Sequence, residues 1–276
     1  MTAATAQIGI VTHSSRIIEQ KHGPIRFLCA VSEGIRINKY LSEVGHCSRR
    51  AADKLLELGR IKINGQVPEL GTKVMPGDEV EVDGQKVGQP TKAEDHVYIA
   101  YHKPVGIVCT TDQKREKDNI IDAIGHERRI FPVGRLDKPS EGLIFLTSDG
   151  DIVNKILRAR NRHEKEYHVT VDRPIRGDFI EDMAGGVPIL DTVTRRCEVV
   201  QTAPRQFKIV LTQGLNRQIR RMCEHLGYNV VRLKRMRIMH MNLDLPMGEW
   251  RDFTPQELED LQGMVNDSSK TYDDPQ

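Results

Sequence analysis

The sequence has no run of apolar residues long enough to cross a bilayer. Charged residues interrupt its N-terminal segment before any apolar stretch reaches signal-peptide length, at Arg16, Glu19 and Lys21. Cysteine is scarce: the chain has five, widely spaced and without a Cys-x-x-Cys pair, which argues against a redox couple. A glycine-rich phosphate loop ending in Lys-Ser or Lys-Thr is also absent, as is the spacing of zinc ligands. These absences predict a protein of the reducing cytoplasm, with no membrane partner and no metal site.

The 276 residues and their apolar content favour one domain of moderate size plus a small one. The net charge of +2 conceals an uneven distribution of charge along the chain, because the last twenty residues hold six acids and one base. Composition and the positions of glycine and proline divide the chain into five parts. We expect a leader at 1–34 that is disordered or lies outside the native start, a small domain at 35–83, a linker at 84–96, a larger domain at 97–262, and a disordered acidic tail at 263–276.

The segment from Gly134 to Gly142 sets one carboxylate, Asp137, in a turn directly before an apolar strand. The two glycines relax the backbone on either side, and Pro139 restricts one φ angle. A carboxylate on such an elbow can be held firmly at a cleft. The commoner role of an Asp in a loop is to bond its own backbone, so the rest of the chain must decide between the two.

The small domain is predicted to contain two helices and a hairpin. Apolar spacing indicates helices over 35–45 and 48–59, each ended by a glycine. Asn64-Gly65 then predicts a two-residue hairpin turn, with the alternation resuming at Val67. Between Ile35 and Gly65 there are seven bases and three acids, a charge that attracts phosphates. This order of elements resembles the S4-type RNA-binding domain, and the resemblance implies phosphate contacts by Lys39, Arg49, Arg50 and Lys54.

The apolar pattern of the larger domain predicts mainly strands, with a few helices. Strands are expected at 97–101, 143–146, 164–171, 196–202 and 206–212, and helices at 149–158, around 219–227 and from Thr254. The segment from Gly214 to Arg237 is the most basic, with seven bases and one acid. Its arginines cannot all lie on the apolar stripe of the helix, so at least one is expected to reach a neighbouring site.

Four motifs follow the small domain in order: Lys103-Pro104-Val105-Gly106, Gly134-Arg135-Leu136-Asp137, Lys165-Glu166-Tyr167-His168-Val169, and Gly214 to Met222. Together with the S4-type pattern, this set resembles the ribosomal pseudouridine synthases. It is most similar to the branch whose A type modifies small-subunit RNA and whose B, E and F types modify large-subunit RNA, and within it to the F type. The resemblance covers roughly residues 35 to 255, with His102 standing where the family usually has Asn. It implies an α+β fold whose catalytic domain is a mixed, mainly antiparallel sheet with a central cleft.

The resemblance also implies a reaction, the isomerisation of uridine to pseudouridine in RNA, with no metal or organic cofactor. Asp137 would be the catalytic carboxylate, and Tyr167 would stack on the base, a contact that holds a ring yet allows it to turn. Arg220 would pair with Asp137, although Arg221 is a competing choice. Arg135 would fill the space left by the flipped uridine, and Lys103 would support the catalytic loop. Arg217 and Arg221 are expected to contact phosphates.

The implied partner is 23S ribosomal RNA or the assembling large subunit, with a tRNA as a second candidate substrate and a monomer as the expected state. One alternative is an RNA-binding assembly factor without catalysis, which would not need Asp137. Another is a carboxylate hydrolase, but that chemistry usually needs two convergent acids, and only Glu141 lies nearby in the sequence. Whether Asp137 attacks carbon or removes a proton stays open.

Overall fold

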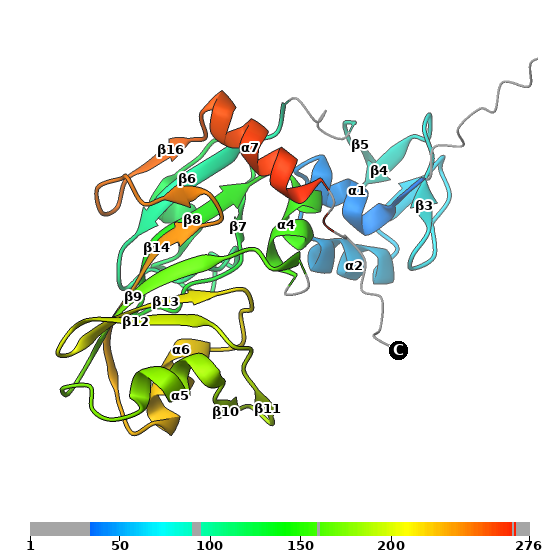
Figure 1. The fold of residues 1–276 in the computed structure, drawn as a ribbon. Coiled ribbons are helices and arrows are strands. Elements are labelled where there is room, and N and C mark those ends of the chain that lie inside the picture. Colours follow the sequence, from blue (N-terminus) through cyan, green and yellow to red (C-terminus); the bar gives the residue numbers. More distant parts are fainter. Residues whose placement is uncertain (1–33, 90–94, 159–160, 267, 269–276) are drawn as a thin grey trace, which may run out of the picture.

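The computed structural model describes residues 34–89, 95–158, 161–266 and 268. Apart from Gly34, the expected leader at 1–34 lies outside these residues, as does most of the acidic tail. Two domains are seen in Figure 1, a small N-terminal one and a larger one built on a long sheet. The small domain contains β1 (Ile35–Arg36), α1 (Ile37–Glu43), α2 (Arg49–Glu57), β2 (Ile61–Ile63), β3 (Lys73–Val74), β4 (Val80–Val82) and β5 (Gln85–Lys86).

Both helices of the small domain form where the apolar spacing predicts them. Ser48 caps α2, its hydroxyl accepting a hydrogen bond from the Ala51 amide at 3.2 Å. Buried apolar residues of α1 and α2 pack on β2, β3 and β4 in one core. This arrangement confirms the two-helix unit with strands.

The hairpin prediction in this domain is partly wrong. Asn64 and Gly65 do take positive φ angles, of 50° and 79°, as a type I′ turn requires. However, β2 pairs with β4, and Val67 is exposed instead of continuing a strand. The turn is local, whereas the choice of strand partner depends on which residues fill the core.

The small domain also extends past the predicted boundary at residue 83. Asp83 and Gly84 form a second two-residue turn that returns the chain as β5 along β4. The Val87 amide then donates to the Val80 carbonyl at 2.8 Å, and the Tyr40 hydroxyl donates to the Gly88 carbonyl at 2.9 Å. The start of the predicted linker is therefore part of the folded unit.

The larger domain is organised by one sheet in the order β12-β13-β9-β14-β8-β6-β16, with β15 beside β14 and β7 beside β8. Among the strand pairings of this sheet in the described residues, only that of β14 with β8 is parallel, so the mixed, mainly antiparallel α+β fold is confirmed. Its strands are β6 (Tyr98–Lys103), β7 (Phe131–Val133), β8 (Glu141–Thr147), β9 (Lys165–Val171), β12 (Glu198–Ala203), β13 (Gln206–Leu211), β14 (Val230–Ile238), β15 (Met241–Asn242) and β16 (Trp250–Asp252); β10 (Pro188–Ile189) and β11 (Thr192–Val193) form a separate hairpin.

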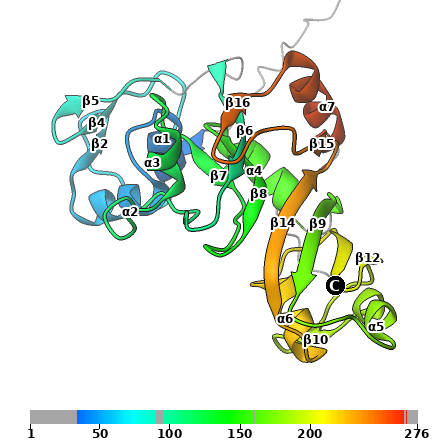
Figure 2. The same ribbon diagram turned by 90° about the vertical axis from the view of Figure 1, so that its left-hand side faces the viewer.

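Helices cover the two halves of this sheet separately. In one half, α4 (Gly150–Leu157) and α7 (Pro255–Val265) pack on one face of β8 and β6, and α3 (Ile120–Ile124) packs on the other. In the other half, α5 (Phe179–Gly185) and α6 (Gln218–His225) pack on β9, β13 and β14. Figure 2 shows β14 and β9 side by side, linking the two halves. The site lies at the junction of these halves.

Strand β8 is buried along its whole length because both faces are covered. Leu143 and Phe145 face one core and Ile144 and Leu146 the other, which explains the continuous apolar run in the sequence. Helix α7 extends three residues past the expected boundary at 262, because Val265 still packs into the core with Leu261. Within the part of the chain that the structure describes, no helix has the length and apolar character needed to span a membrane.

Candidate active site

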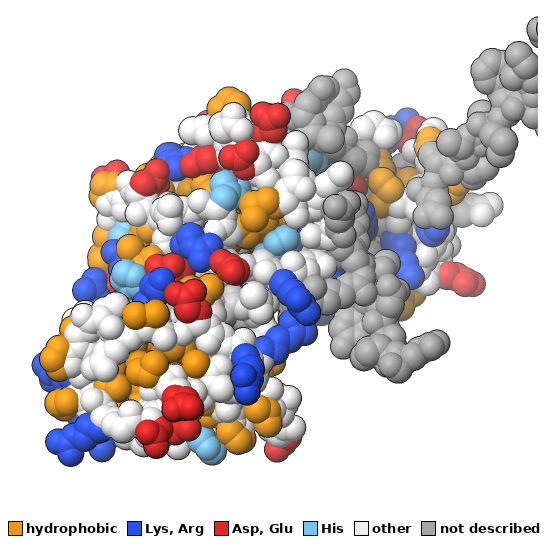
Figure 3. Space-filling view, viewed as in Figure 1, with side chains coloured by type: hydrophobic (Ala, Val, Ile, Leu, Met, Phe, Trp, Pro, Cys, Tyr) orange, Lys and Arg blue, Asp and Glu red, His pale blue; other side chains and the backbone are white. Residues whose placement is uncertain are grey.

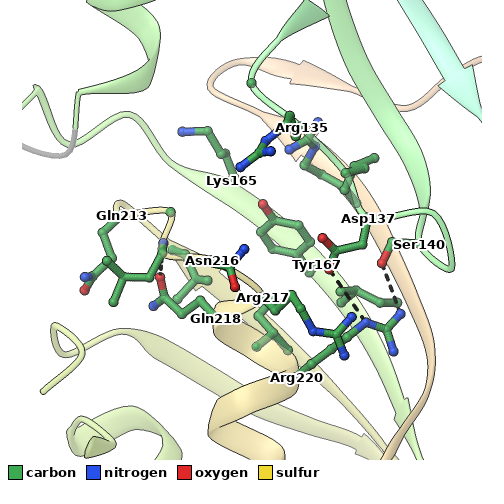
Figure 4. Close-up of a pocket in the computed structure, with 18 of the residues that line it drawn as sticks. Arg135, Asp137, Ser140, Lys165, Tyr167, Gln213, Asn216, Arg217, Gln218 and Arg220 are labelled. Atoms are coloured by element: carbon green, nitrogen blue, oxygen red, sulfur yellow. Dashed lines mark hydrogen bonds and ion pairs between the residues drawn. The ribbon is translucent and has the colours of Figure 1, made fainter. Parts of the chain in front are cut away.

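A cavity of about 290 Å³ lies where the two halves of the catalytic sheet meet. Its floor is formed by side chains from β9, β13 and β14, and its walls by the loop before β8 and by the segment leading into α6. Figure 4 shows the side chains that point into it. The lining residues include Arg135, Asp137 and Tyr167, with Arg217 and Arg220 from the far wall. The fold thus brings together residues that lie more than eighty positions apart in the chain.

Asp137 stands on the loop between β7 and β8, which closes with a hydrogen bond from the Ser140 amide to the Asp137 carbonyl at 2.9 Å. Its side chain is 34% exposed, enough for a substrate to reach it. Arg220 Nε lies 3.9 Å from Asp137 Oδ2. Of the two arginines left open by the sequence, Arg220 is therefore the one that faces the carboxylate.

Arg220 is 7% exposed and ties three parts of the fold together. Its Nη2 donates to Pro139 O at 3.0 Å and to Ser140 Oγ at 3.1 Å, and its Nη1 donates to Val230 O at 3.1 Å. Burial lowers the pKa of the guanidinium, and the charge of Asp137 opposes that shift. Nε has no hydrogen-bond partner among the described residues and points to the carboxylate side. The result is a fixed positive charge beside Asp137.

Gly142 lets β8 approach β14 at the base of the Asp137 loop. Its φ angle is 114°, and a Cβ there would lie 2.3 Å from the Arg235 carbonyl oxygen and 2.5 Å from the Arg235 nitrogen. Only glycine avoids both problems. This close approach sets Asp137 beside the strands that carry Tyr167 and Arg235.

Tyr167 is half-buried on β9 and packs against the cores of both halves. In Figure 4 its ring lies between the Asp137 loop and the segment that contains Asn216. Arg235 is its neighbour on β14, with the guanidinium carbon 5.9 Å from the centre of the ring. An aromatic face held in this way can stack on a base beside the carboxylate.

Arg135 is exposed and lines the cavity next to Asp137. Lys103 does not line it. That side chain is fully buried behind the loop, where Nζ donates to the Pro104 carbonyl at 2.8 Å. Burial lowers the pKa of Lys103 to about 8. A substrate in this cavity would therefore not touch Lys103, and support of the catalytic loop stays a prediction.

Two cationic residues of the cavity, Lys165 and Arg235, were not among the predicted site residues. Lys165 stands two positions before Tyr167 in the same strand, so the period-two pattern could have placed it on the same face. Arg235 had no such signal, because its proximity to Tyr167 depends on the pairing of β14 with β9.

The cations predicted to contact RNA fall into two settings. Lys39 lies at the contact between the domains, where Nζ is 2.7 Å from Asp151 Oδ1 and 3.3 Å from Glu43 Oε1. Arg49 is exposed near the start of α4. Arg50 and Lys54 are exposed on α2 and line a second hollow of about 820 Å³.

That second hollow lies between α2 and the catalytic domain, whose wall adds Arg115, Arg128 and Arg129. Its bases outnumber its acids, Asp112 and Glu127. The face of the molecule in Figure 3 carries basic and acidic side chains interspersed, with a short row of Lys and Arg near its centre. Positive charge is therefore concentrated in local patches, as expected for a chain of net charge +2.

The remaining two arginines differ from each other. Arg217 lines the cavity at the start of α6, with a φ of 51°. Arg221 instead holds the segment before the helix, since its Nε donates to Asn216 O at 3.1 Å and its Nη2 to Asn216 Oδ1 at 3.2 Å. Among the described residues, no group of His, Cys, Asp and Glu side chains is arranged to hold a metal ion.

An S4-type domain joined to a sheet that presents an Asp–Arg pair and a tyrosine in one cavity defines a class, the RNA-modifying enzymes. Comparison with known proteins specifies the family. Residues 97–225 match the family model for RNA pseudouridylate synthase, and residues 35–80 match the S4 domain.

The chain is 58% identical over 236 residues to the dual-specificity RNA pseudouridine synthase RluF of Escherichia coli (strain K12), covering 85% of this chain and 81% of that protein. It is 31% identical to the ribosomal large subunit pseudouridine synthase B of Bacillus subtilis, over 86% of this chain and 99% of the relative. A crystal structure of a pseudouridylate synthase superposes with a TM-score of 0.61 at 27% identity, covering 82% of this chain and 99% of that one. The chain therefore belongs to the RNA pseudouridine synthase family.

Proposed function

We propose that this protein isomerises uridine to pseudouridine at a specific position of 23S ribosomal RNA, with Asp137 as the catalytic carboxylate. The observation that carries the proposal is the position of Asp137 in an accessible cavity, 3.9 Å from a buried arginine and next to Tyr167. The names of the B-type and F-type relatives support an RNA substrate. The dual specificity in the name of RluF supports a second RNA substrate, for which we propose a tRNA.

In this mechanism Arg220 orients the Asp137 carboxylate, because its fixed guanidinium lies 3.9 Å from Oδ2. The carboxylate then attacks the ribose or removes a proton, and the bond between C1′ and N1 breaks. The freed uracil stacks on Tyr167, turns, and rebonds to C1′ through C5. The proton on C5 is lost and N1 gains one, so uridine and pseudouridine have the same composition.

The target uridine must leave its stack to reach the cavity, because its reacting atoms are inaccessible within a helix or a stacked loop. Arg135 is exposed at the rim, which suits a side chain that takes the place of the flipped base. Arg217 at the same cavity, with Arg49, Arg50 and Lys54 on the S4 domain, supports the RNA backbone around the target. We expect the protein to act in the cytoplasm as a monomer.

The test is release of tritium from ribosomal RNA labelled at C5 of uridine. The wild type should release it, and Asp137→Asn should lose release while still binding RNA. Asp178→Asn is the matched control, because Asp178 is exposed and its side chain makes no cap hydrogen bond. Equal release by Asp137→Asn would leave the carboxylate without a role, whereas no release by the wild type would favour an RNA-binding assembly factor.

A further inference from the structure

Lys165 and Arg235 are two cations of the cavity that the proposed reaction has not yet used. Lys165 begins β9, and its Nζ donates to the His163 carbonyl at 3.1 Å, which leaves two of its three donors available. Arg235 is 3% exposed, and its Nε donates to the Leu143 carbonyl at 2.6 Å. Its Nη2 is buried with no hydrogen-bond partner among the described residues. Both side chains therefore have unused donors at the cavity.

The strand register places both cations around Tyr167. Arg235 is the cross-strand partner of Tyr167, and Lys165 lies two residues before Tyr167 on the same face of β9. Figure 4 shows Lys165 on the side of the Tyr167 ring opposite to Arg220. A base stacked on this ring would have the Asp137–Arg220 pair at one side and Lys165 at the other.

Neighbouring cations on the same strands have carboxylate partners, which makes this pair unusual. Arg232 Nε lies 2.5 Å from Glu141 Oε1, and Arg237 Nη2 lies 2.9 Å from Glu164 Oε2. The described part of the chain gives neither Lys165 nor Arg235 a carboxylate partner. Burial, followed by the charge of Arg235, lowers the pKa of Lys165 to about 8, so charging it here has a cost. An occupied cavity should contain a compensating negative charge.

The proposed reaction creates such a charge. When the bond between C1′ and N1 breaks, its electron pair leaves with uracil and spreads over N1, O2 and O4. In the attack route, a bond from C1′ to the Asp137 oxygen forms at the same time; C5 later displaces that oxygen, C5 loses its proton and N1 gains one. In the proton-removal route Asp137 takes the proton from C2′, whose electron pair forms a double bond between C1′ and C2′ as the C1′–N1 pair leaves with uracil. C2′ regains that proton when C5 bonds to C1′, and C5 then loses its own proton while N1 gains one. A cation beside the ring would stabilise the anion in both routes.

We propose that Lys165, supported by Arg235, stabilises the uracil anion as the glycosidic bond breaks, which makes Lys165 a catalytic residue of the leaving-group side. This inference rests on the proposed function. A phosphate of the bound RNA is a competing source of negative charge at the same cations. The two differ in timing: a phosphate is charged from the moment of binding, whereas the base becomes charged only in the transition state. A phosphate contact therefore changes KM, and stabilisation of the leaving base changes kcat.

The experiment uses the full chain and a ribosomal RNA substrate, with Lys165→Met as the variant. We expect kcat to fall roughly 100-fold, as for loss of one preorganised charge, with little change in KM. Lys208→Met is the control, since Lys208 is on the neighbouring strand β13, outside the cavity, and paired with Glu198 at 3.2 Å. Lys165→Arg, which keeps the charge, should recover most of the rate. If Lys165→Met does not fold, Lys165→Gln replaces it, because the amide can still donate to the His163 carbonyl.

A second substrate separates the two sources of charge. In RNA with 5-fluorouridine at the target, fluorine withdraws electrons and makes the departing base a more stable anion. Under single turnover, the variant should therefore lose less of its bond-cleavage rate on this RNA than on the uridine form. Equal losses with a raised KM would assign Lys165 to a phosphate and overturn the proposal. A kcat within threefold of the wild type would also overturn it, whereas a wild type that releases no tritium would instead refute the proposed function.

Discussion

The cations of the cavity and those of helix α2 have opposite environments. Arg220 and Arg235 are 7% and 3% exposed and are held by backbone carbonyls, whereas Arg50 and Lys54 extend from α2 into solvent. A buried, oriented charge acts on one atom of the substrate with little screening, and an exposed one acts on any phosphate within about a Debye length. We therefore expect the proposed chemistry to depend on the first group and RNA affinity on the second.

Loss of Arg220 should have the largest effect. In Arg220→Gln the carboxylate loses its fixed counter-charge and the Asp137 loop loses two hydrogen bonds, at Pro139 and Ser140. We expect kcat to fall about 1,000-fold, which corresponds to about 4 kcal/mol, with KM changed much less. Single-turnover tritium release would measure this.

The neighbour Arg221 is the matched comparison, because it bonds Asn216 and does not line the cavity. Arg221→Gln should mainly raise KM. If the two variants lost kcat equally, an arginine that faces Asp137 and one outside the cavity would not differ in their roles.

The next largest effect is a loss of folding stability. Gly142→Ala forces a side chain into a positive φ and against the backbone of Arg235, which cannot move away as a side chain could. We expect a loss of at least about 3 kcal/mol in the free energy of unfolding, measured by urea denaturation. Gly185→Ala is the control: its Cβ would meet nothing within 4 Å, so its stability should stay close to wild type. A wild-type stability for Gly142→Ala would show that the β8–β14 approach is adjustable.

Lys103 should make stability depend on pH. Its folded pKa of about 8 lies below its usual value of 10.5, so between these limits the unfolded chain binds more protons than the folded one. Stability therefore rises with pH across this window as the cost of the buried charge is removed, by about 3 kcal/mol.

Denaturation of the wild type and of Lys103→Met at several pH values isolates this contribution. The difference between their free energies of unfolding should change between pH 8 and 10, favouring the wild type as pH rises. For Lys62→Met, at an exposed position on β2, the difference should stay flat. If the difference for Lys103→Met were also independent of pH, charging the buried Lys103 side chain would not destabilise the folded protein.

Loss of the exposed cations of α2 should have the smallest effect on the protein, a weaker affinity for RNA. The double variant Arg50→Gln/Lys54→Gln should weaken RNA binding roughly tenfold, with kcat at saturation nearly unchanged. The slope of log affinity against log salt should become shallower by about one unit per lost phosphate contact. Arg60→Gln/Lys86→Gln removes two bases of the same domain that already pair with carboxylates, so it should bind nearly as the wild type. Identical salt slopes for the two double variants would remove α2 from the RNA interface.

Several features could be predicted because their signals are local. The helices of the small domain, the apolar strand β8 and the turn at Asn64-Gly65 each follow from spacing or from residues that accept particular backbone angles. The turn at Asp83-Gly84 had an equally local signal, and overlooking it placed the domain boundary before β5. The pairing of β2 with β4 had no local signal, because partners are chosen by the core that they fill together.

The same division applies to the site. The sequence by itself was enough to propose Asp137 as the catalytic carboxylate, since four ordered motifs behind an S4-type pattern indicated the family and an arginine partner for it. Which arginine faces it, and the presence of Arg235 beside Tyr167, were decided only by the tertiary structure. Side chains from the loop before β8, from β9 and β14, and from α6 meet only after the long-range strands pair. The electrostatic environment of each depends on what lies within a few ångströms in space and not along the chain.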